Sequence, residues 1–140
     1  MSAKKLYTAK VHTVGGREGA AKSSDGELDI KLSTPGTNKP GTNPEQLFAA
    51  GWSACFEGAL AHVARQAGIQ LPADTAVDAE VDLNLDEVDG FFLVARLNVS
   101  IPGVSDELAQ QLIDQAHETC PYSKMTKGGI PASVRLAVAA

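Results

Sequence analysis

The first part of the chain alternates between apolar and polar positions, the period-two pattern of half-buried strands. Residues 7–13 and residues 28–32 show this alternation most clearly. The pair Gly15–Gly16 and the run at residues 24–26 are turn signals, so residues 17–23 are expected to return as a strand between them. The apolar face of the first strand would carry Tyr7, Ala9 and Val11. We therefore predict an N-terminal meander of three strands.

A loop rich in Pro, Gly, Thr and Asn, residues 33–43, separates this meander from a long helix. Loops of this length in a compact domain are often functional. Asn43 is placed to cap the helix, with Pro44 at its first position and Gln46 completing a box-like pattern. Residues 47–68 are small and apolar nearly all round, which indicates burial on most sides. A chain of 140 residues has few elements to cover such a helix, so we predict a homodimer with this helix near the interface.

A second hairpin, a second helix and a last strand are predicted in the rest of the chain. Residues 77–85 alternate with an acidic outer face, and Asp89-Gly90 signals the turn of a hairpin. The apolar face of the return strand is Leu93, Ala95, Leu97, Val99 and Ile101. Ser105 is expected to cap a helix that ends before Pro121. The stripe of that helix is Leu108, Leu112, Ile113 and Ala116, and the last strand is Ala132, Val134, Leu136 and Val138. These elements predict one α+β domain over residues 1–140.

Composition narrows the class of protein further. Hydrophobic residues make up 44% and charged residues 21%, so the chain can build a core. Twelve basic and seventeen acidic residues give a formal charge of −5, which disfavours nucleic-acid binding and binding to a membrane surface. No apolar run approaches the roughly 20 residues of a membrane helix. The N-terminus lacks the apolar stretch of a secretory signal, so a cytoplasmic protein is expected.

The two cysteines, Cys55 and Cys120, allow two interpretations. Neither belongs to a CxxC or CxxH cluster, which disfavours a metal site, and both could be small buried hydrophobes. Cys55 shares a stripe of the central helix with Phe48 and Trp52. Burial alone raises the pKa of a thiol, so a reactive Cys55 needs a cation from elsewhere in the fold. Arg17, which lies among glycines, is the candidate, and an exposed strand residue is the alternative.

Glu45 and Cys120 also have a structural and a functional interpretation. Glu45 either faces the positive end of the helix dipole or orients an arginine through a bidentate pair. Ten residues of straight helix would separate Glu45 from Cys55 by about 15 Å. One site can hold both only if the helix breaks between them, which we place at Gly51, or if Glu45 reaches back over the turn. Cys120 points toward the core at a helix end, where a second thiol could convert a sulfenic acid into a disulfide. The spacing of the two cysteines does not set their distance.

Taken together, these residues resemble one family. Residues 41–56, GTNPEQLFAAGWSACF, and the later Cys-Pro-Tyr-Ser at residues 120–123 are similar to the Ohr branch of the OsmC/Ohr family. The segments GGREG at residues 15–19 and SSDG at residues 23–26 also resemble it, so the match covers nearly the whole chain. Two positions depart from the family pattern: Trp52 stands where tyrosine is usual, and residues 124–129 differ from the usual run.

The resemblance implies a thiol-dependent peroxidase, built as an intertwined homodimer with two active sites at the subunit interface. It implies that Cys55 is the peroxidatic and Cys120 the resolving cysteine, with Arg17 and Glu45 as partners in the site. The substrates would be organic hydroperoxides, including those of fatty acids. The reductant would be dihydrolipoamide or a lipoylated protein, with no metal, haem or flavin cofactor.

A mechanism joins the residues to the resemblance. Arg17 would stabilise the Cys55 thiolate and orient the peroxide, and Glu45 would hold Arg17 in place. Phe48 and Trp52 would bind the alkyl group, although these aromatic side chains could equally belong to the core. The alternatives are a peroxidase of the OsmC branch, a redox sensor that oxidises without turnover, and a ligand-binding dimer with inert cysteines.

Overall fold

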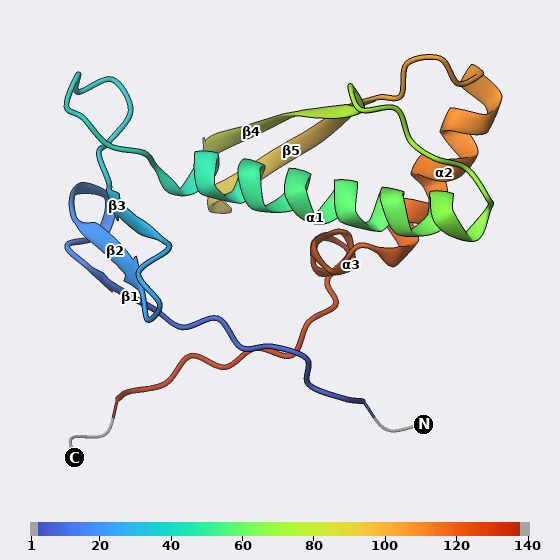
Figure 1. The fold of residues 1–140 in the computed structure, drawn as a ribbon. Helices are drawn as coiled ribbons and strands as arrows, with labels where there is room; N and C mark the ends of the chain where they lie inside the picture. The colour runs from blue at the N-terminus through green and yellow to red at the C-terminus, as the bar shows by residue number, and fades with distance from the viewer. Residues whose placement is uncertain (1–2, 138–140) are drawn as a thin grey trace. The chain divides into compact units, whose positions relative to one another are not determined.

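The computed structural model describes residues 3–137 of the chain (Figure 1). It has two compact units, residues 1–48 and residues 49–140, and its helices and antiparallel strands confirm the α+β class. The single domain expected from the sequence stays a prediction. Within the described residues, no helix combines the length and apolar character that crossing a membrane requires.

The first unit contains the predicted meander. Strands β1 (Val11–Val14), β2 (Ala20–Ser23) and β3 (Asp29–Lys31) form an antiparallel sheet in the order β1-β2-β3. The turn after β1 includes a short 3-10 helix, η1 (Gly16–Glu18), which takes the place of the first residues of the predicted second strand. Gly15 has φ 76°, in the left-handed region that glycine adopts without strain, so this tight turn depends on it.

The first strand is shorter than predicted. Residues 7–10 belong to no strand, and Tyr7 is 77% exposed rather than half-buried. The physical reason is the length of the neighbouring strand. The register pairs Val11 with Ser23, and the chain then turns at Ser24, whose N–H donates to the carbonyl of Lys10. Beyond that point β2 offers no backbone partner to the preceding residues.

The long helix begins where the sequence predicts and continues unbroken to its end. Helix α1 (Pro44–Gln66) is capped by Asn43, whose Oδ1 accepts from the backbone N–H of Gln46 at 2.8 Å. The Gln46 side chain accepts from Thr42 instead of closing a box with the cap residue. Helix α1 is one unbroken helix (Figure 1). Its bounds include Gly51, so the break expected there is wrong. Its buried side chains are Trp52, Phe56, Ala59, Leu60, Val63 and Ala64.

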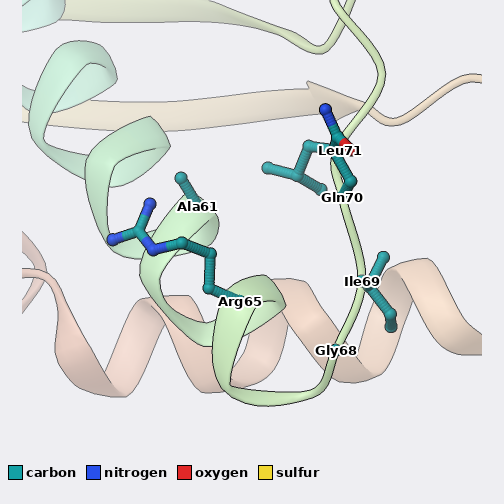
Figure 2. A pocket seen from close by; sticks show the side chains of 6 residues that line it. All are labelled: Ala61, Arg65, Gly68, Ile69, Gln70 and Leu71. Carbon is teal, nitrogen blue, oxygen red and sulfur yellow. The ribbon is translucent and has the colours of Figure 1, made fainter.

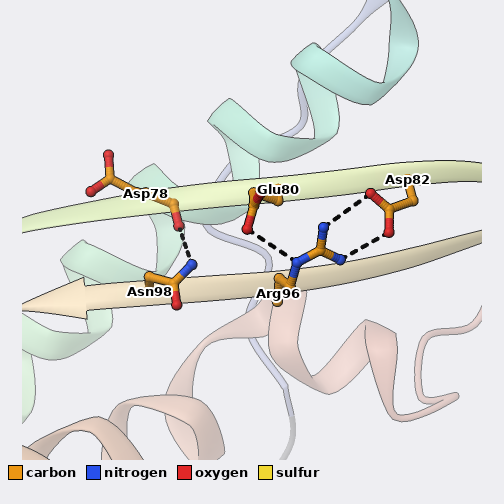
Figure 3. Close-up of polar contacts among 5 residues, drawn as sticks. All are labelled: Asp78, Glu80, Asp82, Arg96 and Asn98. Atoms are coloured by element: carbon orange, nitrogen blue, oxygen red, sulfur yellow. Dashed lines mark hydrogen bonds and ion pairs between the residues drawn. The ribbon is translucent and has the colours of Figure 1, made fainter.

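The second unit contains the predicted hairpin. Strands β4 (Ala76–Asp86) and β5 (Gly90–Ser100) pair along their whole length. One face is polar, and there Arg96 bonds both Glu80 and Asp82 while Asn98 bonds the carbonyl of Asp78 (Figure 3). The other face is apolar, and neither strand contains a buried residue. Asp78 and Glu80 of β4 are exposed, as the alternation predicts, whereas Asp82 is half-buried and Leu83 and Leu85 of the apolar face are also exposed.

Two helices follow the hairpin. Helix α2 (Asp106–Thr119) is capped by Ser105, whose hydroxyl accepts from the N–H of Leu108, as predicted. Pro121 does not only end this helix; it also begins a short helix, α3 (Pro121–Thr126), that was not predicted. The last strand expected from alternation is wrong over residues 132–137, which form no strand, and Val138 lies outside the described residues. Neither of the two described sheets includes this segment, and alternation without a paired strand does not make a sheet.

Candidate functional site

The second unit brings the two cysteines together. Both are thiols, and the Cys120 Sγ donates to the Cys55 Sγ across 3.4 Å. Cys55 lies on α1 and is half-buried, whereas Cys120 is fully buried between α2 and α3. The Cys120 backbone is held on both sides, because its N–H donates to Ala116 and its carbonyl accepts from the N–H of Lys124. Two thiols 65 residues apart in sequence therefore lie close to bonding distance.

The surroundings of Cys55 disfavour its thiolate. Burial raises the pKa of the Cys55 thiol, and the neighbouring Cys120 raises it further. The backbone N–H of Tyr122 donates to the Cys55 sulfur and lowers its pKa in part. No cation contributes to this balance among the described residues. A nucleophilic Cys55 at neutral pH therefore requires a positive charge beyond these groups.

Helix α3 is fixed against α1 by contacts next to the cysteines. The indole Nε1 of Trp52 donates to the Ser123 hydroxyl at 3.1 Å, and both side chains are buried. A Cβ on Gly51 would lie 2.9 Å from the Tyr122 hydroxyl, so only glycine lets the tyrosine ring lie this close. Gly51 thus serves a close approach rather than the helix break that we expected.

The first unit brings together the two predicted charged residues. Arg17, on η1, and Glu45, in the first turn of α1, form a two-point pair. The contacts are Nη1 to Oε2 at 3.1 Å and Nη2 to Oε1 at 2.8 Å. The pair raises the pKa of the Arg17 guanidinium, so this group stays a cation. The side chain of Glu45 is only 12% exposed, whereas that of Arg17 is 40% exposed. The bidentate geometry considered from the sequence is present.

Arg17 also borders an apolar cavity within the first unit. The cavity has a volume of about 340 Å³ and is lined by side chains of all three strands, including Val11, Ala21 and Ile30, and by Leu47 of α1. A guanidinium at the edge of an apolar cavity suits a molecule with a polar head and an alkyl part.

A second cavity has no comparable chemistry. It measures about 680 Å³ and lies at the C-terminal end of α1, where Arg65, Ile69 and Leu71 are among the lining residues (Figure 2). Its lining contains no nucleophile and, besides Arg65, no titratable side chain. Among residues 3–137, no group of three or more His, Cys, Asp or Glu side chains could hold a metal ion.

Phe48 and Trp52, the other two predicted site residues, both lie on α1. Phe48 is half-buried in α1 and Trp52 is 7% exposed. Their part in substrate binding stays a prediction, as do the roles of the cysteines, Arg17 and Glu45. The contacts of Tyr122 and Ser123 with α1 were not predicted from the sequence. A proline directly after Cys120 favours the first position of a new helix, and that signal could have predicted α3.

Comparisons with known proteins identify the family of this chain. The family model described as OsmC-like protein matches residues 11–135. An organic hydroperoxide resistance protein of Xanthomonas axonopodis pv. citri is 47% identical over 138 residues, covering 96% of each chain. OhrB of Bacillus subtilis, also named an organic hydroperoxide resistance protein, is 46% identical over 135 residues, covering 94% of this chain and 98% of the other.

Solved structures show the same fold. The crystal structure of OhrB of Bacillus subtilis aligns with a TM-score of 0.82, covering 89% of this chain and 93% of that chain. A structure from Legionella pneumophila, described as an organic hydroperoxide resistance protein OsmC, aligns with a TM-score of 0.83 at 42% identity, covering 89% of this chain and 93% of that chain. The chain therefore belongs to the OsmC/Ohr family, in its organic hydroperoxide resistance branch.

Proposed function

We propose that the protein detoxifies organic hydroperoxides, as a thiol peroxidase that works through Cys55 and Cys120. The observation that carries this proposal is the 3.4 Å separation of the two sulfur atoms. The relatives named organic hydroperoxide resistance proteins support the same role. A nucleophile and its resolving thiol must meet when the disulfide forms, and here the two sulfur atoms already lie side by side in the reduced protein.

The proposed reaction has three steps. The Cys55 thiolate attacks the distal oxygen of the hydroperoxide, the O–O bond breaks, and the alcohol leaves after taking a proton. Cys55 is then a sulfenic acid, and the Cys120 thiol condenses with it to form a disulfide and water. A dithiol reduces this disulfide by exchange and is itself oxidised to a cyclic disulfide. We propose a dihydrolipoyl group, on dihydrolipoamide or on a lipoylated protein, as that dithiol, with no metal, haem or flavin cofactor.

Arg17 is proposed to supply the cation that Cys55 lacks within its own unit. A guanidinium near the sulfur would counter the effect of burial on the pKa of Cys55 and favour the thiolate. It would also bind the peroxide oxygen on which negative charge develops. Glu45 would hold the guanidinium in one orientation through the two-point pair. The apolar cavity beside Arg17 supports a substrate with an alkyl group, including fatty-acid hydroperoxides, and Phe48 and Trp52 are proposed to contact that group.

We also propose that the protein acts as an intertwined homodimer, with its active sites at the subunit interface. The exposed apolar face of the β4–β5 hairpin supports this, because exposed patches of this kind mark interaction sites. Its exposed large side chains are Leu83, Leu85, Phe91 and Leu93. We propose a second copy of the chain as the partner of this face.

The test is a turnover assay with cumene hydroperoxide and dihydrolipoamide. We expect many equivalents of hydroperoxide to be reduced per protomer, and hydrogen peroxide to be reduced more slowly because it has no alkyl group to bury. Consumption of one equivalent would instead indicate a redox sensor. The absence of any reaction would leave a ligand-binding protein with inert cysteines and would overturn the proposal.

A further inference from the structure

Two links join the same two segments of the second unit. One is the thiol pair, Cys55 with Cys120, and the other is the hydrogen bond from Trp52 to Ser123. Trp52 precedes Cys55 by three residues on α1, so the two side chains lie on the same face of the helix. Ser123 follows Cys120 by three residues, at the start of α3. The hydrogen bond therefore lies beside the thiol pair and joins the same two segments of the chain.

Both partners of the hydrogen bond are buried, as is the neighbouring Cys120 thiol. Trp52 is 7% exposed, and Ser123 and Cys120 are both 0% exposed. Removing either partner of a buried hydrogen bond leaves the other polar group without water to replace it. The bond thus strongly favours one position of residues 120–123 against α1. The close contact of Tyr122 with Gly51 has the same effect on the neighbouring residue.

The position matters because disulfide formation is short-ranged. The sulfur atoms are 3.4 Å apart, and a disulfide is about 2.05 Å long, so they need approach by only about 1.4 Å. An oxidised Cys55 has two possible fates. It condenses with the Cys120 thiol and releases water, or it receives a second oxygen from another hydroperoxide, giving a sulfinic acid and an alcohol. The first fate requires that residues 120–123 remain docked.

We propose that the Trp52–Ser123 hydrogen bond positions Cys120 for disulfide formation and so protects Cys55 from further oxidation. Both residues are positioning residues in this role, since they act through the placement of Cys120. The protection against peroxide rests on the proposed function. The effect on disulfide formation does not, because any two-electron oxidant of the two thiols forms the same bond.

The test compares five variants of the full chain with the unaltered protein. Trp52→Phe removes the donor, Ser123→Ala removes the acceptor, and a double variant removes both. Ser33→Ala is the matched control. Ser33 lies in the first unit and, like Ser123, is a buried serine with a hydrogen-bonded hydroxyl, which donates to the carbonyl of Lys39. The dithiol–disulfide equilibrium is measured in glutathione buffers, and the sulfinic acid formed under excess cumene hydroperoxide is measured by mass spectrometry.

We expect each single variant to lower the equilibrium constant for disulfide formation about tenfold, the upper value for one hydrogen bond, or about 30 mV. The reason is that the dithiol form gains undocked positions of Cys120, whereas the disulfide keeps the segment in place. The sulfinic fraction should rise in parallel. Ser33→Ala should change neither quantity. Ser123→Thr, which keeps the hydroxyl, should stay near the unaltered protein.

The double variant identifies the hydrogen bond itself. If the two residues act through their mutual bond, the double variant is no worse than either single variant. Equal constants for Ser123→Ala and the unaltered protein, or fully additive effects in the double variant, would overturn the proposal. A protein that reduces no hydroperoxide but shows the expected shift in glutathione buffers would contradict the proposed function and support this inference.

Discussion

Arg17 and Arg96 both pair with carboxylates, yet their surroundings differ. Arg96 lies on the exposed face of the β4–β5 hairpin and bonds two acidic side chains, Glu80 and Asp82, at distances of 2.9 to 3.1 Å (Figure 3). Arg17 bonds one acidic side chain, Glu45, and lines an apolar cavity. Arg96 thus has two carboxylates for one positive charge, whereas Arg17 has one.

This difference separates a structural arginine from one suited to chemistry. An anion approaching Arg96 meets two carboxylates that already occupy the guanidinium. The pair of Arg17 with Glu45 uses two of the five N–H donors of a guanidinium, and its charges cancel. Arg17 therefore has donors for a thiolate or a peroxide oxygen, whereas Arg96 ties the two strands of the hairpin together.

The largest expected effect is that of Arg17→Ala on the reaction of Cys55 with peroxide. We predict that the second-order rate constant for cumene hydroperoxide falls about 100-fold or more, as when a preorganised donor to a developing charge is removed. Stopped-flow measurement of the single-turnover reaction checks this. Arg96→Ala is the control and should react like the unaltered protein. Equal losses for the two variants would remove the distinction between the two arginines.

The pH dependence of Cys55 sharpens the same comparison. Burial raises the pKa of the Cys55 thiol, and a nearby cation would lower it, so the thiolate should form at higher pH in Arg17→Ala. We predict that the midpoint of iodoacetamide alkylation against pH moves upward in that variant. Cys120→Ser isolates the signal of Cys55. A midpoint that does not move would show that Arg17 does not act on the sulfur.

Glu45→Gln should have a smaller effect. The amide keeps the shape and one acceptor for the guanidinium but loses the charge and the second acceptor. We predict about a fivefold loss in the rate constant, comparable to one hydrogen bond, with Arg17 still present to act. Glu80→Gln is the matched control on the hairpin and should leave the rate unchanged. A Glu45→Gln protein as slow as Arg17→Ala would mean that the carboxylate itself takes part in the chemistry.

The smallest effect is expected for Arg96→Ala on stability. The ion pairs of Arg96 are exposed, so we predict a fall in Tm of no more than about 4 °C at neutral pH. Arg96 lowers the pKa of Asp82 in the folded protein. A carboxyl group with a lowered pKa stabilises the fold at pH values above its unfolded-state pKa, and this stabilisation is lost as the pH falls through the folded-state pKa. The difference from the unaltered protein should therefore disappear in acid. Thermal melts at several pH values test this, and a difference that persists in acid would contradict it.

The elements of the fold were predictable where a local signal decides them. Asn43 and Ser105 cap their helices through the hydrogen bonds that their residue types favour. The meander and the hairpin follow from alternation and from turn residues. The predicted strand at residues 132–137 and the early start of the first strand were wrong because a strand also needs a partner. Alternation in one segment carries no information about that partner.

The candidate site was predictable as residue types and not as geometry. Sequence alone singled out Cys55, Cys120, Arg17 and Glu45, but it could not place residues that lie far apart in the chain. The contact of Gly51 with Tyr122 depends on tertiary packing, so its glycine was misread as a helix break. The same packing brings two sulfur atoms to 3.4 Å, a distance that no spacing in the sequence indicates.

The most direct test of the account is the mass of the intact protein after one equivalent of cumene hydroperoxide. If Cys55 is the nucleophile and Cys120 resolves it, the chain loses two hydrogen atoms and peptide mapping finds one disulfide between Cys55 and Cys120. The Cys120→Ser protein should instead gain oxygen at Cys55. A chain that consumes the hydroperoxide while both thiols remain reduced would contradict the account.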